Sequence, residues 1–319
     1  MNKNAKIYVA GHRGLVGSAI CKKLSEQGYT NIITRTHSEL DLLNQQKVND
    51  FFKFENPEYV FIAAAKVGGI GANSTYPAEF IYQNMMIGFN IVHASYVNGV
   101  RKLMNLGSSC IYPKMASQPM KEEELLSGYL EPTNDAYAVA KIAVIKQCTA
   151  YNKQYGTNFL SAMPTNLYGP GDNYDPFNSH VLPAMIRKFH EAKINGINEV
   201  ILWGDGSPYR EFLYSEDLAD AVIYLIQNKN ASDLRNPAGD FVNIGTGKEL
   251  TIKQLAEAIR DIVYKDSSAV CKIIWDTSMP NGTPRKLCDV CRLANLGFTA
   301  RTEFSEGIKK AYKDFLNRY

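Results

Sequence analysis

Two residues with complementary proton chemistry stand four positions apart in the segment Tyr137-Ala138-Val139-Ala140-Lys141, so a helix would place both on one face. Tyrosine has an ordinary pKa of about 10, and a nearby ammonium lowers that value toward the range useful for acid–base catalysis. The segment Gly107-Ser108-Ser109-Cys110 follows an apolar run that reads as a strand. Because open α/β sheets place their chemistry at the carboxyl ends of strands, we predict that this segment lies beside Tyr137 and Lys141 in one catalytic site.

A glycine-rich turn, Gly11-His12-Arg13-Gly14-Leu15-Val16-Gly17, joins a short apolar strand to a helical pattern. Glycines at this spacing let the backbone turn tightly, approach a pyrophosphate and pack the helix on the sheet, which predicts a dinucleotide site. The second strand ends in Thr34-Arg35-Thr36-His37, which offers no carboxylate for the ribose hydroxyls of NAD. Arg35 and Arg13 can instead pair with a 2′-phosphate, so NADP(H) is the predicted cofactor.

The elements that must position these residues alternate between apolar runs and helical patterns. We predict strands at 7–10, 32–33, 60–64, 103–106, 159–163 and 200–203, and helices at 15–24, 77–98, 136–155, 181–194, 251–263 and 304–315. Residues 164–178 are rich in Pro, Gly, Asn and Tyr and are interpreted as a long functional loop. The fold class is α/β: a doubly wound parallel Rossmann sheet with a smaller mixed α/β substrate domain.

The predicted division gives residues 1–166 and 212–246 to the NADP-binding Rossmann domain, and residues 167–211 and 247–319 to the substrate domain. Residue composition restricts the partners. A net charge of +3 without a basic run argues against nucleic acid, and no apolar stretch is long enough for a membrane span, so we expect a cytoplasmic protein.

Six scattered cysteines do not form the pattern of a disulfide framework. Cys288 and Cys291 make a lone CxxC without further ligands, interpreted as two thiols on a short strand or turn, so no metal site is predicted.

Five stretches carry a resemblance to the GDP-L-fucose synthase family of the extended short-chain dehydrogenase/reductase superfamily. They lie near both ends of the chain and between: Ala10-Gly11-His12-Arg13-Gly14, Ala64-Ala65-Lys66-Val67-Gly68-Gly69-Ile70, Gly107-Ser108-Ser109-Cys110-Ile111-Tyr112-Pro113, Met163-Pro164-Thr165-Asn166-Leu167-Tyr168-Gly169-Pro170 and Gly282-Thr283-Pro284-Arg285-Lys286. The resemblance implies an enzyme, an NADP-dependent oxidoreductase that acts on GDP-4-keto-6-deoxy-D-mannose. Its expected reaction is epimerisation at C3 and C5, then NADPH-dependent reduction at C4 to GDP-L-fucose.

The resemblance also implies roles for individual residues. Cys110 and His180 match the pair that moves the C3 and C5 protons, which suits a thiolate and an imidazole. Tyr137 matches the proton donor to the C4 oxygen, Lys141 its electrostatic partner and ribose contact, and Ser108 the hydrogen-bonding residue on the keto oxygen.

Two further sets of binding residues follow from the same resemblance. The implied cofactor-binding set is Gly11, His12, Arg13, Gly14, Leu15, Val16, Gly17, Arg35, Leu42, Ala64, Ala65, Leu106, Gly107, Lys141, Pro164, Thr165, Asn166, Leu167 and His180. The implied substrate-binding set is Arg187, Trp203, Arg210, Asn281 and Lys286. A homodimer is implied as well, with the helices at 77–98 and 136–155 as its seam.

Three alternatives stay open. Charged residues usual in the family are replaced by Met279 and Asn281, which leaves room for a C4 reductase without epimerisation, acting on a related GDP-4-keto-6-deoxy-sugar such as a heptose. A UDP-sugar 4-epimerase that recycles NAD is disfavoured by Arg35 and Cys110. A non-catalytic NADP-sensing module is disfavoured because every catalytic position is filled.

Overall fold

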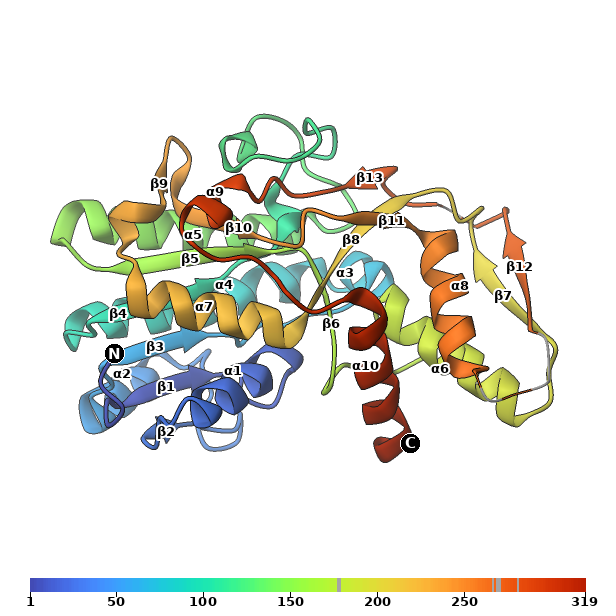
Figure 1. The fold of residues 1–319 in the computed structure, drawn as a ribbon. Helices are drawn as coiled ribbons and strands as arrows, with labels where there is room; N and C mark the ends of the chain where they lie inside the picture. The colour runs from blue at the N-terminus through green and yellow to red at the C-terminus, as the bar shows by residue number, and fades with distance from the viewer. Residues whose placement is uncertain (177–178, 266, 268–270, 280) are drawn as a thin grey trace.

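The computed structural model describes residues 1–176, 179–265, 267, 271–279 and 281–319. At its centre is a seven-stranded sheet with the order β2-β1-β3-β4-β5-β10-β9 (Figure 1). Its strands are β1 (Ile7–Ala10), β2 (Ile32–Ile33), β3 (Tyr59–Ile62), β4 (Lys102–Leu106), β5 (Phe159–Pro164), β9 (Arg235–Asn236) and β10 (Gly239–Ile244). All neighbouring pairs are parallel except β9 with β10.

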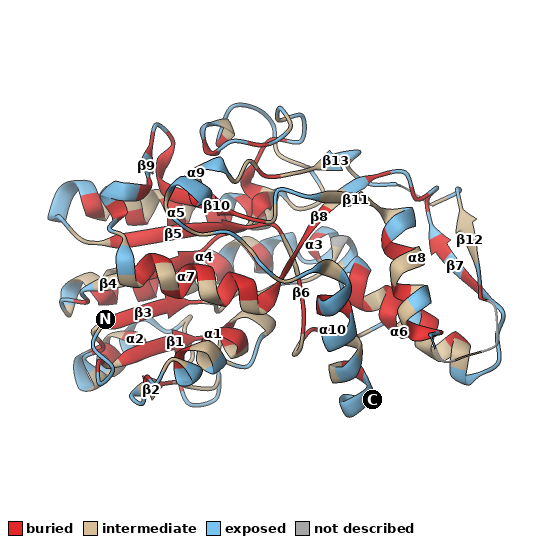
Figure 2. Ribbon diagram, in the orientation of Figure 1, coloured by how far each residue is buried: buried red, intermediate tan, exposed pale blue. Residues whose placement is uncertain are grey.

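Helices cover both faces of this sheet, as the apolar strands require. One face is packed by α1 (Leu15–Glu26) and α7 (Ser215–Asn228), and the other by α2 (Gln45–Glu55), α4 (Pro77–Val97) and α5 (Asp135–Tyr155). The central strands are buried along their length (Figure 2). Such double burial is why they carry continuous apolar runs rather than alternating ones. The predicted doubly wound α/β sheet is confirmed.

A second group of elements packs at the carboxyl ends of the large sheet. It contains a four-stranded sheet of β6 (Asn166–Tyr168), β8 (Tyr209–Tyr214), β11 (Glu249–Thr251) and β13 (Arg285–Lys286), and a parallel pair of β7 (Glu199–Trp203) and β12 (Lys272–Asp276). Its helices are α6 (Val181–Ile194), α8 (Ile252–Val263) and α10 (Phe304–Arg318), which share a separate apolar cluster with β8. The residue limits of the two domains stay a prediction.

One buried carboxylate ties the second group to the first. Glu211 on β8 has no exposed surface, and its side chain accepts backbone hydrogen bonds from Thr246 (2.6 Å), Gly247 (2.7 Å) and Cys288 (2.9 Å). Burial raises the pKa of Glu211, and the three N–H groups oppose that shift because they favour the ionised form. The loop after β10, strand β8 and the segment after β13 are thereby held at one point.

Each predicted strand and helix occurs in the structure, but several further elements are not predicted. Within residues 164–178, interpreted as a loop, Pro164 ends β5 and Asn166–Tyr168 form β6, which pairs with Phe212–Tyr214 far along the chain. That pairing partner lies outside any local pattern, and the loop prediction is wrong for these four residues. Strands β8 to β13 are not predicted, although β10 belongs to the large sheet, and neither are helices α2, α3 (Ile70–Thr75), α7 and α9 (Cys291–Asn295). Helix α10 continues to Arg318. Residues 177–178 of the same loop lie outside the described part.

The two cysteines of the lone CxxC lie in different environments. Cys288 is buried and forms an isolated β-bridge with Met120, whereas Cys291 is exposed and opens α9 (Cys291–Asn295). Within the described ranges, no group of three or more His, Cys, Asp or Glu side chains could hold a metal ion. Across the same residues, no helix combines the length and the apolar character that crossing a membrane would need.

The turn between β1 and α1 is packed so tightly that it has no room for a side chain at Gly17, and this predicts the effect of a substitution there. A Cβ on Gly17 would lie 2.1 Å from the carbonyl oxygen of Gly11 and 2.9 Å from His12 Cα. Gly17→Ala should therefore lower the free energy of unfolding by roughly 1–3 kcal/mol, as overpacking does, measured by chemical denaturation. Gly71→Ala is the matched control, because a Cβ there meets nothing within 4 Å and alanine is the better helix former. Equal stability of the two variants would contradict this account.

Candidate active site

A buried ammonium joins the end of β4 to helix α5. Lys141 is 7% exposed, and its Nζ donates a hydrogen bond to the carbonyl oxygen of Leu106 (2.9 Å), the last residue of β4. The same Nζ lies 5.7 Å from the centre of the Tyr137 ring. Beyond Leu106 the chain turns into a short 3-10 helix (Ser109–Ile111), capped by Ser108 Oγ, which accepts the N–H of Cys110 (3.3 Å). The predicted group of Ser108, Cys110, Tyr137 and Lys141 thus gathers at one strand end.

Burial dominates the proton chemistry of this group. It raises the pKa of Tyr137, and a nearby Cys110 thiolate adds to the rise. Burial lowers the pKa of Lys141 to about 8, while the Cys110 charge acts in the opposite sense. The expectation that the ammonium lowers the tyrosine pKa is therefore wrong for this structure, because desolvation of the phenolate outweighs it. Tyr137 is a phenol at neutral pH and can give a proton rather than take one.

His180 approaches the same region from the second group of elements. It is the N-cap residue of α6, and desolvation lowers its pKa, so the imidazole is neutral at neutral pH. The preceding Ser179 carbonyl lies 3.4 Å from where a Cβ on Gly69 would stand. The next glycine back, Gly68, packs on Phe80, whose ring meets Tyr137 edge to face at 6.3 Å. The start of α6 therefore lies beside the 64–69 loop, which in turn packs on Phe80 next to Tyr137.

The glycine turn has the shape that a close-approaching pyrophosphate needs. Gly11 has φ +83°, and a Cβ there would lie 2.6 Å from Ala64 N, so no side chain fits. Gly14 donates its N–H to Gly11 O (3.0 Å) and caps α1 without a side chain, which leaves the first N–H groups of that helix accessible to an anion. The predicted residues Gly11–Gly17, with His12, Leu15 and Val16 among them, all belong to this turn or the start of α1.

The remaining predicted cofactor residues line the carboxyl edge of the same sheet, apart from Leu42. They follow or end β3, β4 and β5 in turn: Ala64 and Ala65, Leu106 and Gly107, and Pro164, Thr165, Asn166 and Leu167. Thr165 Oγ1 and Asn166 Nδ2 donate to the carbonyl of Glu211 (3.3 and 2.8 Å). Leu42 precedes α2, and its carbonyl accepts a hydrogen bond from Asn90 Nδ2 (2.8 Å).

The two arginines expected at a 2′-phosphate differ in their surroundings. Arg13 is exposed and forms no ion pair or hydrogen bond with any residue that the structure describes. Arg35 is half-buried: it forms a short ion pair with Glu55, donates to the Thr34 carbonyl (2.8 Å) and covers the Phe51 ring. The structure therefore leaves the Arg13 guanidinium exposed and ties Arg35 to α2.

Two cations of the predicted substrate set stand side by side. Arg210 on β8 and Lys286 on β13 are direct Cα partners in a parallel pair. The Arg210 guanidinium donates to the Tyr209 carbonyl (2.8 Å) and has no carboxylate partner among the described residues. Burial lowers its pKa. Adjacent cations that are partly desolvated and lack an acidic partner are suited to bind a phosphate or diphosphate.

The other predicted substrate residues lie on or next to different elements, and of these the segment of Asn281 approaches this pair, since a Cβ on Gly282 would lie 3.4 Å from Arg210 Nη2. Trp203, at the end of β7, is 62% exposed. Asn281 Oδ1 accepts the N–H of Asp205 (2.9 Å) and so holds the turn that follows Trp203. Arg187 on α6 forms an ion pair with Glu191 (2.6 Å) and donates to the Tyr174 carbonyl (3.0 Å).

Two buried polar residues that support the site were missed by sequence reasoning. Glu211 is one, and the only signal in the sequence is a carboxylate directly before the apolar run Phe212-Leu213-Tyr214. Tyr174 is the other: it is fully buried although its segment reads as a polar loop, and no local pattern indicated this.

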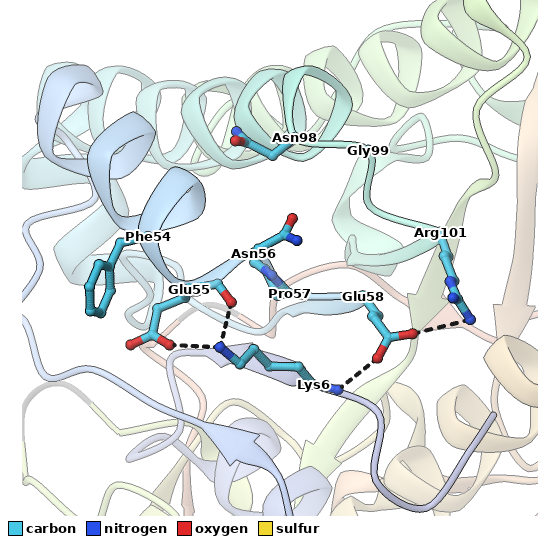
Figure 3. Close-up of a pocket in the computed structure, with 9 residues that line it drawn as sticks. All are labelled: Lys6, Phe54, Glu55, Asn56, Pro57, Glu58, Asn98, Gly99 and Arg101. Atoms are coloured by element: carbon cyan, nitrogen blue, oxygen red, sulfur yellow. Dashed lines mark hydrogen bonds and ion pairs between the residues drawn. The ribbon is translucent and has the colours of Figure 1, made fainter.

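A polar surface pocket lies at the opposite, amino-terminal edge of the sheet (Figure 3). Lys6 pairs with Glu55 (3.3 Å), and Arg101 pairs with Glu58 (3.1 Å). Its charged side chains thus satisfy one another, and it does not compete with the carboxyl edge as the functional site.

Comparison with known proteins adds to this geometry. The chain matches the model of the NAD dependent epimerase/dehydratase family over residues 7–245. It is 54% identical over 315 residues to GDP-L-fucose synthase 1 of Arabidopsis thaliana, across 99% of this chain and 94% of that one. It is 51% identical over 314 residues to GDP-L-fucose synthase of Escherichia coli (strain K12), across 98% and 96%. A solved structure, MlghC, the GDP-mannoheptose C4 reductase from Campylobacter jejuni with NADP bound, has a TM-score of 0.90 at 40% identity and covers 99% of each chain.

The lowered pKa of Lys141 can be measured directly. Because the pKa of Lys141 is lowered to about 8, its ammonium should lose its proton as the pH rises through that value, far below the ordinary lysine pKa of about 10.4. NMR of protein labelled with ¹³C at lysine Cε should show one resonance titrating near pH 8, and Lys141→Met should remove it. A Lys141 resonance that titrates above pH 10 would show that the site is well hydrated.

Proposed function

The chain belongs to the NAD dependent epimerase/dehydratase family, and we propose that it converts GDP-4-keto-6-deoxy-D-mannose to GDP-L-fucose with NADPH. The proposed reaction epimerises C3 and C5 and then reduces C4. The observation that carries the proposal is the group of Cys110, Tyr137 and Lys141 at the end of β4, with His180 at the start of α6, beside the 64–69 loop. The relatives of 51–54% identity, both named GDP-L-fucose synthase, support it.

In the epimerisation, the C4 ketone acidifies the protons on its two neighbouring carbons. We propose that the Cys110 thiolate removes a proton from C3 or C5, leaving the electron pair delocalised onto the C4 oxygen. Ser108 holds that oxygen by a hydrogen bond. His180 returns a proton to the carbon from the other face in its imidazolium form, the minor form because desolvation lowers its pKa. The neutral imidazole that remains then takes a proton from the Cys110 thiol or from solvent. Two such cycles invert both carbons.

In the reduction, bound NADPH supplies the hydride that C4 receives. Tyr137 donates its phenolic proton to the C4 oxygen as the alcohol forms. The Lys141 ammonium stabilises the phenolate that remains, and its fixed hydrogen bond to Leu106 O keeps it beside the ring. This role requires the ammonium form, which the lowered pKa still permits at neutral pH.

The residues present fit the dinucleotide. The glycine turn has no side chain at Gly11 or Gly17, so its backbone would approach a pyrophosphate closely at the N-terminus of α1. The proposed nicotinamide contacts lie at the end of β5, at Pro164, Thr165 and Asn166. Arg13 would pair with the 2′-phosphate, with Arg35 as the second predicted cation.

The proposed nucleotide-sugar site lies on the second group of elements. Arg210 and Lys286 would bind the diphosphate together with Arg187, and Trp203 would cover the base or sugar. Asn281 replaces a charged residue usual in the family, but its side-chain oxygen still accepts the Asp205 N–H. The hydrogen bond that holds the turn after Trp203 is therefore present without the charge.

We also propose that the protein is a homodimer through α4 and α5. These helices pack on each other closely, since a Cβ on Gly88 would lie 2.2 Å from Val144. Each leaves large apolar side chains in solvent: Tyr82, Phe89 and Val97 on α4, and Val139 and Tyr155 on α5. Exposed apolar surface of this kind favours association.

The second candidate is a C4 reductase without epimerase activity. Met279 and Asn281 in place of charged residues favour it, as does the likeness to the heptose C4 reductase. The identity to that enzyme is 40%, against 51–54% to the two fucose synthases, so the epimerising function is the better supported.

Cofactor selectivity should depend mainly on Arg13. Removing one charge-assisted contact costs about 1.5–3 kcal/mol, so Arg13→Ala should weaken NADPH binding roughly tenfold to a hundredfold and leave NADH affinity unchanged, measured by calorimetric titration. Arg35→Ala should cost less, because Glu55 already engages that guanidinium. Equal affinity of the unaltered protein for NADPH and NADH would refute the NADP assignment.

The epimerisation is tested by solvent exchange. With substrate and NADPH in D₂O, the product should carry deuterium at C3 and C5 and have the L-configuration, as read by NMR. Cys110→Ser should suppress the exchange, because a serine hydroxyl is a far weaker base than a thiolate, and leave C4 reduction possible. Tyr137→Phe should do the reverse, lowering reduction by roughly 10²–10⁴-fold while exchange continues. A product without deuterium from the unaltered enzyme would establish the C4 reductase instead.

A further inference from the structure

The segment that leads to His180 is held by the C-terminal helix. Gly171 donates its N–H to Asp314 Oδ2 (2.9 Å), and Arg318 Nη1 donates to the carbonyl of Asp172 (3.0 Å). Arg318 also pairs with Asp314 (3.2 Å), so the two α10 side chains form one unit. On its other side Gly171 packs on α1, since a Cβ there would lie 3.3 Å from Ser18 Oγ. The segment is clamped between α1 and α10.

Tyr174 connects this clamp to helix α6. Its ring is fully buried and packs on Phe315 (4.9 Å between ring centres), and its hydroxyl donates to the carbonyl of Ala311 (2.9 Å). Its own carbonyl accepts Arg187 Nη1 (3.0 Å). Tyr174 is therefore fixed to α10 by its side chain and to α6 by its backbone.

A backbone hydrogen bond links the residue after Tyr174 to the residue before His180. The carbonyl of Asp175 accepts the N–H of Ser179 (3.1 Å), and His180 then caps α6. The position of the imidazole thus depends on where residues 171–174 are held. On the proposed function, which requires His180 to reach one face of the sugar ring, an error of about 1 Å in such a group can cost a hundredfold in rate.

We propose that Asp314 and Arg318 are positioning residues for the epimerisation, acting on His180 through the segment Gly171–Tyr174. They touch neither the glycine turn nor the Tyr137–Lys141 pair, so their effect falls on proton transfer at C3 and C5 and not on hydride transfer at C4. The proposal rests on the proposed function and assigns a role in it to a helix outside the motif-bearing segments.

The experiment separates the two half-reactions. Exchange of the C3 and C5 protons is followed by NMR with GDP-4-keto-6-deoxy-D-mannose and NADP⁺ in D₂O, where no reduction occurs. Hydride transfer is followed separately as NADPH formed from GDP-L-fucose and NADP⁺ in a single turnover. Asp314→Ala should slow exchange roughly tenfold or more, with hydride transfer within about threefold and NADPH affinity within about twofold of the unaltered enzyme.

Glu306→Ala is the matched control. It removes another acidic side chain of α10, whose partner is Lys309 (2.6 Å) on the solvent side, and should leave both half-reactions unchanged. Arg318→Met should reproduce the loss seen with Asp314→Ala, and Arg318→Lys should restore part of it. Tyr174→Phe removes only one hydroxyl and should slow exchange in the same direction by a smaller factor, which keeps the test available if Asp314→Ala does not fold.

The outcomes are distinct. Wild-type exchange rates in folded Asp314→Ala and Arg318→Met would overturn the positioning role, as would an equal loss of exchange and hydride transfer, because that pattern indicates general damage. Absence of exchange in the unaltered enzyme, with hydride transfer intact, would overturn the proposed function itself and this role with it. Selective loss of exchange, with Glu306→Ala unaffected, supports both.

Discussion

The carboxylate of Glu211 is the contact on which the geometry of the site depends. It is fully buried, and three backbone N–H groups from two separate segments satisfy it. A buried carboxyl group is tolerated only when hydrogen bonds replace its hydration, so the three segments cannot separate without leaving its oxygens unpaired. Arg210 directly precedes Glu211, and Thr165 and Asn166 bind its carbonyl. The proposed diphosphate contacts are thereby held at a fixed distance from the proposed nicotinamide contacts.

The two sides of the site are built with different stiffness. On the sheet side, Lys141 reaches the end of β4 from a helix that is itself buried on the sheet, so Tyr137 and Ser108 have rigid supports. On the other side, His180 caps α6, and the loop before it is held by polar contacts from α10 and from Arg187 on α6. Placing such loops above the carboxyl ends of a parallel sheet is the usual arrangement of α/β enzymes.

Features that depend on residues close in the sequence could be predicted from it, and features that depend on residues distant in the chain could not. Strands β1 to β5 and the glycine turn are predictable because double burial gives continuous apolar runs, and because a Cβ at Gly11 has no space. Strand β10 was missed, although it is buried along its length. Strand β6 is not predictable, because it forms by pairing with β8, which is distant in the chain and was itself not predicted. The same holds for Arg35: residue type suggested a phosphate ligand, but Glu55 at the end of α2 engages it. The tyrosine pKa was misjudged because burial, not the adjacent ammonium, decides it.

The chemistry of the keto-sugar fixes the order of the two proposed half-reactions. The C4 ketone acidifies the protons on C3 and C5, and reduction at C4 removes that ketone, so epimerisation has to come first. A thiolate at Cys110 raises the pKa of Tyr137 and of Lys141 alike, which favours a phenol and an ammonium beside it. The proton that the proposed reduction needs is therefore retained on Tyr137 while Cys110 acts as the proposed base.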